Sequence, residues 1–193
     1  MSEMRETDLP PAVRLVRDFV NTLEPQLGAE SLTSPDRLRD WLAERQLVPA
    51  DARLGPPDLT AALTIREGLR AVLLGHNDHR ADPAAVGALN DALARFPLRL
   101  TFAGDRPHLA SASSAAFEQA LAELLDAIRQ CGEDDTWPNL KVCARDSCRW
   151  AFYDASRNHA RRWCSMAGCG NHVKMQRAYA ARKRRRQPVP DSP

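Results

Sequence analysis

The stretch Cys143-Ala-Arg-Asp-Ser-Cys148, separated by fifteen residues from Cys164-Ser-Met-Ala-Gly-Cys169, decides how the C-terminal part of this chain folds. Each of the two segments offers a pair of thiols across a loop of four residues. Zinc prefers four tetrahedral ligands, with each sulfur about 2.3 Å from the ion, and two short loops facing each other across a longer segment can supply them. We therefore expect one structural Zn²⁺ bound by all four cysteines, which leaves no coordination position for water or substrate.

The alternatives to a zinc site are two disulfides or four unrelated buried thiols. Disulfides are disfavoured because the start of the sequence, MSEMRETDLPP, lacks the apolar segment of a secretory signal. Unrelated thiols would not normally cluster within 27 positions. The fifth cysteine, Cys131, is expected to be a buried apolar residue rather than a ligand. The lack of a secretory signal leads us to expect a cytoplasmic protein. We do not expect a membrane protein, since no apolar run approaches the roughly 20 residues that cross a bilayer.

The charge of the chain is divided unevenly at residue 140. Residues 1–140 carry 14 arginines against 22 acidic residues, whereas residues 141–193 carry 13 lysines and arginines against three aspartates. No acidic residue lies between Asp154 and Asp191. A basic block of this kind indicates either a nucleic-acid partner or a solvated tail that aids solubility.

The residues after the last cysteine are rich in helix formers and end before a proline, which predicts a basic helix. On this helix Lys174 and Arg177 share one side, and we expect Val173, Met175 and Tyr179 to pack back against the zinc loops. The side chains expected to contact nucleic acid are Arg157, Arg161, Arg162, Asn171, His172, Lys174, Arg177, Arg182, Arg184 and Arg185.

The first 132 residues are typical of a mainly helical unit. Apolar residues recur at helical spacing in segments that begin near Pro10, Ser34, Asp58, Asp82 and Ser114. Residues 98–112 instead alternate with a period of two around a Gly-Asp turn, which predicts two antiparallel strands. The fold class expected from these patterns is α+β, with one short β-hairpin among helices.

No coherent set of acid, base and nucleophile stands out in residues 1–140, so we do not expect an enzyme. His76 and His79 lie near Asp78 and Asp82 and are conceivable metal ligands. Exposed polar residues at a helix end are the simpler interpretation of these histidines.

Several of these segments resemble a known bacterial family. The segments that are similar to a CGNR-type zinc finger are Ser156-Arg157-Asn158, Arg161-Arg162-Trp163-Cys164-Ser165-Met166 and Cys169-Gly170-Asn171. The segments Asp18-Phe19-Val20-Asn21-Thr22 and Trp41-Leu42 are similar to the opening of the ABATE domain that precedes this finger. The resemblance implies a transcription regulator in which the four cysteines bind zinc and the following segment contacts DNA.

One residue departs from the family pattern. His172 stands where the signature has an arginine after Gly-Asn. Three interpretations of this change are open. The histidine keeps a neutral hydrogen bond in place of the arginine, or it becomes charged only at lower pH, or it is a tolerated surface substitution. The last interpretation is the simplest.

Together these features predict three parts: an ABATE-like domain over residues 1–132 for ligand sensing or dimerisation, a CGNR-like four-cysteine zinc finger over residues 139–186 ending in a basic helix, and a disordered tail over residues 187–193. The expected function is that of a zinc-dependent DNA-binding transcription regulator. The alternative is an RNA-binding or ribosome-associated zinc protein, whose stacking residues would be Trp150, Phe152, Tyr153 and Trp163. The expected partner is duplex DNA, with a small-molecule effector at the N-terminal domain and a second copy of the chain as further candidates. We do not expect binding to a membrane.

Overall fold

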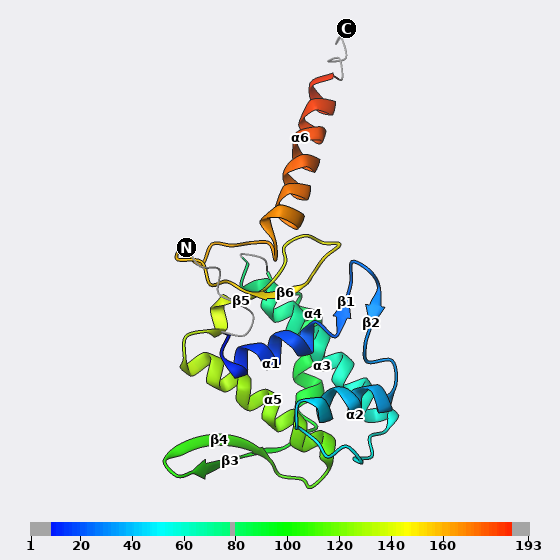
Figure 1. Ribbon diagram of the computed structural model, residues 1–193, viewed down its shortest axis with the longest axis vertical. Coiled ribbons are helices and arrows are strands. Elements are labelled where there is room, and N and C mark those ends of the chain that lie inside the picture. The colour runs from blue at the N-terminus through cyan, green and yellow to red at the C-terminus, as the bar shows by residue number, and fades with distance from the viewer. Residues whose placement is uncertain (1–8, 78–79, 187–193) are drawn as a thin grey trace.

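The computed structural model describes residues 9–77 and 80–186, with side chains through residue 183 (Figure 1). The elements up to residue 133 are α1 (Pro11–Val20), β1 (Leu23–Glu24), β2 (Ala29–Glu30), α2 (Pro35–Glu44), α3 (Pro56–Gly75), α4 (Pro83–Leu93), β3 (Leu98–Ala103), β4 (Arg106–Ser111) and α5 (Ala116–Glu133). They are followed by η2 (Trp137–Asn139), β5 (Leu140–Val142), β6 (Ala151–Tyr153), the π-helical turn η3 (Met166–Gly170) and α6 (Asn171–Arg186). This arrangement confirms the α+β prediction, while the predicted tail over residues 187–193 lies outside the described residues. None of the described helices is both long and apolar enough to span a membrane.

Two helices begin where the sequence places a capping residue before a proline. The side chain of Ser34 accepts a hydrogen bond from the backbone N–H of Arg37 at 3.2 Å, and α2 follows. The carboxylate of Asp82 accepts the backbone N–H of Ala84 at 3.0 Å, and α4 follows. Both contacts satisfy a backbone donor that has no partner within the first helical turn.

The main core lies between α1, α3 and α5. Val13, Val16 and Val20 are fully buried there, so the apolar stripe predicted for the first helix is confirmed. Against α3, helix α4 approaches closely at Gly68, where a Cβ atom would lie 2.4 Å from the Cβ of Leu89. A glycine is therefore needed at this contact between two helices.

The predicted hairpin is present and runs antiparallel, with Leu100 opposite Leu109. Strand β4 packs on α5, and the backbone N–H of Leu109 donates to Asp126 at 2.8 Å. Strand β3 therefore forms the outer strand, and its Leu100 and Phe102 are 59% and 67% exposed. The period of two indicated a strand but not which of its faces is covered.

Besides the pair β1–β2 and the hairpin β3–β4, a third antiparallel pair, β5–β6, extends this core into the segment that carries the cysteines. Leu140 pairs with Tyr153 and Val142 pairs with Ala151 in antiparallel register. Leu140, Val142 and Ala151 are fully buried in the same hydrophobic cluster as the N-terminal helices. The cysteine segment is therefore docked on the helical part through shared apolar contacts.

Side chains from the N-terminal part bind the backbone of the hairpin β5–β6 and of the loop within it. The amide of Asn21 donates to the carbonyl of Ala151 at 2.9 Å and accepts its N–H at 2.7 Å, so it takes the place of a neighbouring strand. Arg70, which is buried on α3, donates to the carbonyl of Val20 at 2.6 Å and to that of Arg149 at 2.8 Å. These contacts join residues that are far apart in the sequence.

We expect Arg70→Met to destabilise the whole chain by about 3 kcal/mol, because the substitution leaves the buried carbonyl of Val20 and the part-buried carbonyl of Arg149 without their charged donor. Thermal unfolding followed by circular dichroism measures this change. The matched control is Arg53→Met, which alters an exposed arginine and should shift the free energy of unfolding by less than about 0.5 kcal/mol. Equal effects of the two substitutions would contradict the role assigned to Arg70.

Candidate metal centre and basic helix

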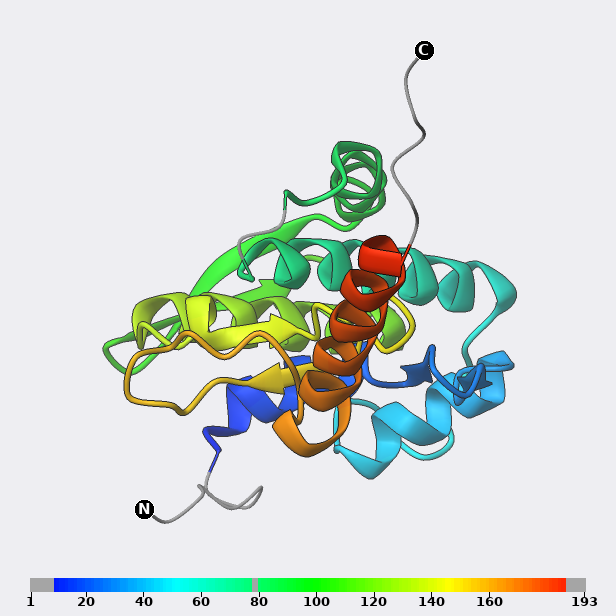
Figure 2. The ribbon, with the colours of Figure 1, turned by 90° about the horizontal axis from the view of Figure 1, so that it is seen from above.

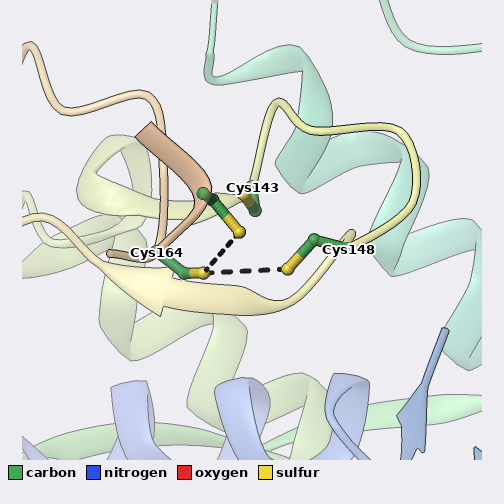
Figure 3. Close-up of side chains that lie close together, drawn as sticks. Cys143, Cys148 and Cys164 are labelled. Atoms are coloured by element: carbon green, nitrogen blue, oxygen red, sulfur yellow. Dashed lines mark hydrogen bonds between the residues drawn. The ribbon is translucent and has the colours of Figure 1, made fainter. Parts of the chain in front are cut away.

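The four cysteines that the sequence singled out meet at one point. Their sulfur atoms all lie within 4.8 Å of one another. The sulfurs of Cys148 and Cys164 are 3.7 Å apart, and those of Cys164 and Cys169 are 3.8 Å apart. Four thiolates placed tetrahedrally at about 2.3 Å from one zinc ion would be separated by about 3.8 Å. Figure 3 shows the sulfurs of Cys143, Cys148 and Cys164 gathered in this way.

The backbone around each pair of cysteines is fixed by hydrogen bonds. The N–H of Cys143, directly after β5, donates to the carbonyl of Trp150 at 2.8 Å, and the N–H of Cys148 donates to the carbonyl of Arg145 at 2.9 Å. In the second pair, the N–H of Gly170 donates to the carbonyl of Ser165 at 2.9 Å. Both loops are thus closed turns that direct two sulfurs to the same side.

Contacts across the site hold the two loops together. The N–H of Ala144 donates to the carbonyl of Arg162 at 2.9 Å. The buried amide of Asn77, at the end of α3, donates to the carbonyls of Val142 and Arg162 at 2.6 and 3.2 Å. A small core of Phe152, with Trp150 and Trp163 at its edge, surrounds the cysteines.

The thiols titrate as a group because they are so close. Hydrogen bonds from Cys148 and Cys164 lower the pKa of Cys143 to about 2. The same contact with Cys143 raises the pKa of Cys148 to about 11, and it also raises the pKa of Cys164. Four thiolates at these distances therefore need a divalent cation to offset their repulsion, and the all-sulfur donor set fits zinc.

The four cysteines thus form one structural zinc site. When bound, the ion supplies a cross-link between the two loops, and its four thiolates leave no position for catalysis. The guanidinium of Arg145, 3.8 Å from the sulfur of Cys169, adds positive charge beside this anionic cluster. Cys131 is fully buried in the main core, as expected for an apolar residue that is not a ligand.

The turn between the two pairs of cysteines is built around a buried carboxylate. Asp154 is fully buried and accepts hydrogen bonds from the ammonium of Lys141 and the backbone N–H of Arg161, both at 2.9 Å. Burial alone raises the pKa of this carboxyl, but the bonds from Ser156 and Lys141 outweigh it and lower the pKa below its usual value. This network shapes residues 154–161, which include Arg157.

The residues expected to contact nucleic acid do not share one environment. Arg157, Asn171, Lys174, Arg177 and Arg182 are exposed, whereas Arg161, Arg162 and His172 are half-buried. Arg161 donates to the carbonyls of Trp163 and Cys164, and its guanidinium lies 5.2 Å from the ring centre of Phe152. The side chains of Arg184 and Arg185 lie outside the described residues. Asn171, Lys174, Arg177 and Arg182 lie on α6, Arg157 lies in the segment between β6 and η3, and Arg161 is used within the finger.

Helix α6 projects away from the body at the end that carries β5 and β6 (Figures 1 and 2). The expectation that Met175 and Tyr179 pack back on the zinc loops is wrong, since these side chains are 72% and 73% exposed. Val173, in the first turn, is half-buried. The direction in which α6 leaves the zinc turn, rather than its pattern of apolar residues, decides this exposure.

One further expectation is corrected at the end of α3. His76 is half-buried rather than exposed, and its Nδ1 atom lies 2.8 Å from the carbonyl oxygen of Leu140. Its ring lies nearly perpendicular to that of Trp137, with the ring centres 5.3 Å apart. His79 lies outside the described residues. His76 thus belongs to the contacts that attach the zinc segment to the helices.

Sequence reasoning missed the residues that hold this segment in place. Asn21, Arg70 and Asn77 act on backbone groups 65 to 130 positions away, and no local spacing reveals such contacts. The only available signal was the resemblance of Asp18-Phe19-Val20-Asn21-Thr22 to a family motif. The structure supplies a physical reason for that motif through the paired bonds of Asn21.

We predict that the purified protein binds one zinc ion per chain and that Cys164→Ser weakens this binding at least tenfold, because one thiolate ligand is lost. Competition with a chromophoric chelator measures the affinity. Cys131→Ala is the matched control and should retain the full affinity. Unchanged zinc binding in Cys164→Ser would contradict the assignment.

We predict that Asp154→Asn lowers the free energy of unfolding by about 3 kcal/mol at pH 7, because Lys141 is left buried without its anion. The control, Asp146→Asn, alters a side chain that is 92% exposed and should have little effect. The pKa of Asp154 is lowered in the folded state, so the difference between wild type and variant should narrow below pH 3.8, the usual carboxyl pKa. Chemical unfolding at several pH values tests this, and a difference that widens on acidification would contradict it.

Comparison with known families agrees with this geometry. Residues 13–139 match the ABATE family model, described as "Putative stress-induced transcription regulator", and residues 139–185 match the model described as "CGNR zinc finger". No curated protein matches the sequence. The first model covers more than half of the chain and the second contains all four clustered cysteines. The chain therefore belongs to the ABATE family and carries a CGNR zinc finger at its C-terminal side.

Proposed function

We propose that this protein is a DNA-binding transcription regulator in which a structural zinc ion holds the basic helix α6 in position to contact duplex DNA. The observation that carries this proposal is the exposure of a basic helix without acidic residues beside a closed metal site. The four-cysteine site has no open position, so the proposal assigns the ion no catalytic role. The description of the matched ABATE family points to the same biological role.

The charge and length of α6 suit a polyanion. Its 16 residues include seven lysines and arginines and no acidic residue, and they extend over about 24 Å. Lys174 and Arg177 lie three positions apart on one side, where like charges repel and destabilise an isolated helix. Phosphates would offset this repulsion, and the major groove of B-DNA is wide enough to admit an α-helix.

The alternative of RNA binding has less support. It depends on aromatic side chains that are free to stack on unpaired bases. Phe152 is buried, and Trp150, Tyr153 and Trp163 are half-buried around the cysteines or the main core, so they do not form an exposed platform for several successive bases. Tyr179 is exposed on α6, but a single exposed ring offers little stacking surface. Duplex DNA is therefore the partner that we favour.

A two-fold dimer fits this proposal, since two copies of α6 would then read two halves of a palindromic site. The N-terminal helices would supply the contact between the copies. Measurement of the protein mass in solution, with and without a palindromic duplex, tests this part of the proposal separately from DNA binding.

We predict that affinity for duplex DNA falls with salt, with a log–log slope near −5 if about six phosphates are contacted. Replacing Lys174, Arg177 and Arg182 together by Gln should make the slope shallower by about 2 to 3. Fluorescence anisotropy of a labelled duplex at several salt concentrations measures both slopes.

A charge-matched control replaces three exposed arginines of the N-terminal part, Arg37, Arg53 and Arg99, by Gln. This control should keep the wild-type slope, since its charges lie away from α6. A wild-type protein that does not bind, or equal losses in the two triple variants, would overturn the proposal.

A further inference from the structure

A cleft of about 820 Å³ lies between the first two helices and the zinc segment. Its wall includes Arg17 and Trp41 from α1 and α2, and Trp150, Arg161 and Cys164 from the zinc segment. Clefts that bind small molecules commonly measure about 300 to 1,000 Å³ and often lie where two structural units meet. This cleft has both properties, and Cys164, which lines it, is also a ligand of the zinc site.

The walls of the cleft combine aromatic and polar surface. Trp41, Trp150 and Tyr153 line it and are only half-buried, so part of each ring remains open to a bound molecule. Flat aromatic faces of this kind stack on planar ligands at a centre-to-centre distance of about 4.5 to 7 Å. The aromatic lining therefore favours a planar ligand over an aliphatic one.

The charge of the lining favours an anion. Among the residues that the structure describes, three arginines, Arg17, Arg45 and Arg161, line the cleft, and Asp18 is the single acidic residue of the lining. Asp18 is already paired with Arg17 at 2.7 Å. The described lining residues carry a formal charge of +2, from three arginines and one aspartate, which a carboxylate group would partly neutralise.

Arg45 offers the most accessible donors. Its guanidinium lies 3.9 Å from the ring centre of Trp41, and its Nη1 atom donates to the carbonyl of Trp41 at 3.0 Å. The carboxylate of Glu44 is 3.6 Å from the same nitrogen. Among the described residues, no contact engages Nε or Nη2 of Arg45. A guanidinium presents donors in a fork that matches a carboxylate, and this one is held over an indole ring.

Arg161 lines the cleft from the zinc segment. Its Nε and Nη2 atoms donate to the carbonyls of Trp163 and Cys164, which fixes the guanidinium at the edge of the zinc site. A ligand in the cleft would thus meet one cation from the end of α2 and one from the zinc segment.

We propose that this cleft binds a planar aromatic carboxylate, whose ring contacts Trp41 and Trp150 and whose carboxylate faces Arg45 and Arg161. Such a ligand contacts the helical part and the zinc segment at once, so it stabilises their docked arrangement. If α6 contacts DNA, binding of the ligand changes the affinity for DNA, and binding of DNA changes the affinity for the ligand by the same factor. Binding in the cleft itself does not require that the protein bind DNA.

Isothermal titration calorimetry of the full zinc-loaded chain, without DNA, tests the inference with indole-3-acetate as the probe. We expect saturable binding with a Kd of about 10 μM to 1 mM, the range of small ligands of this size. The uncharged analogue indole-3-acetamide keeps the ring and should bind at least tenfold more weakly. The cation tryptamine should not bind.

Arg45→Gln should weaken binding of indole-3-acetate at least tenfold, whereas Arg37→Gln, an exposed position on α2, should leave it unchanged. Circular dichroism establishes that both variants are folded. If Arg45→Gln unfolds, the affinities of the wild-type protein for indole-3-acetate and indole-3-acetamide still test whether the cleft prefers an anion. Equal affinity for acid and amide, or no heat of binding up to 10 mM (about tenfold above the weakest expected Kd), would overturn the inference, and neither result depends on whether the chain binds DNA.

Discussion

The geometry of four sulfurs around one ion is the constraint on which the rest of the structure depends. A tetrahedral site requires Cys143 and Cys148 to stay within about 4 Å of Cys164 and Cys169, although fifteen residues separate the pairs. The hairpin β5–β6, which carries the first pair of cysteines, is buried in the main core. The chain after the site is α6, which leaves the body. The zinc site therefore connects the core to the basic helix and fixes the direction of that helix.

Polar side chains of the N-terminal helices hold the hairpin β5–β6 against the core. A hairpin of two three-residue strands has unpaired backbone groups at both edges, and burial makes unpaired groups costly. Asn21 satisfies both groups of Ala151, while Asn77 satisfies the carbonyl of Val142. Arg70 extends the same contact to the loop at Arg149. The two matched family segments consequently share one core and one network of hydrogen bonds.

The features that follow from local spacing were predictable from the sequence. The pairs of cysteines, the apolar stripe of α1 and the start of α2 at Ser34 each depend on residues within one turn or one loop. The contacts of Asn21 and Arg70 were not predictable, because their partners lie 130 and 79 positions away. The apolar residues of α6 were misleading, since a pattern within a helix cannot reveal that no neighbour covers it. The cleft, likewise, is formed only when Trp41 and Trp150 are brought together by docking.

Hydrogen exchange measured by mass spectrometry, with and without removal of zinc by a chelator, tests the central claim that the ion couples the core to the basic helix. Loss of zinc should speed amide exchange in the cysteine loops, in β5 and β6, and also around Asn21 and the end of α3, because these segments share hydrogen bonds. The hairpin β3–β4 should keep its protection and serves as the internal reference. Faster exchange confined to residues 160–186, with β5, β6 and α1 unchanged, would contradict the account.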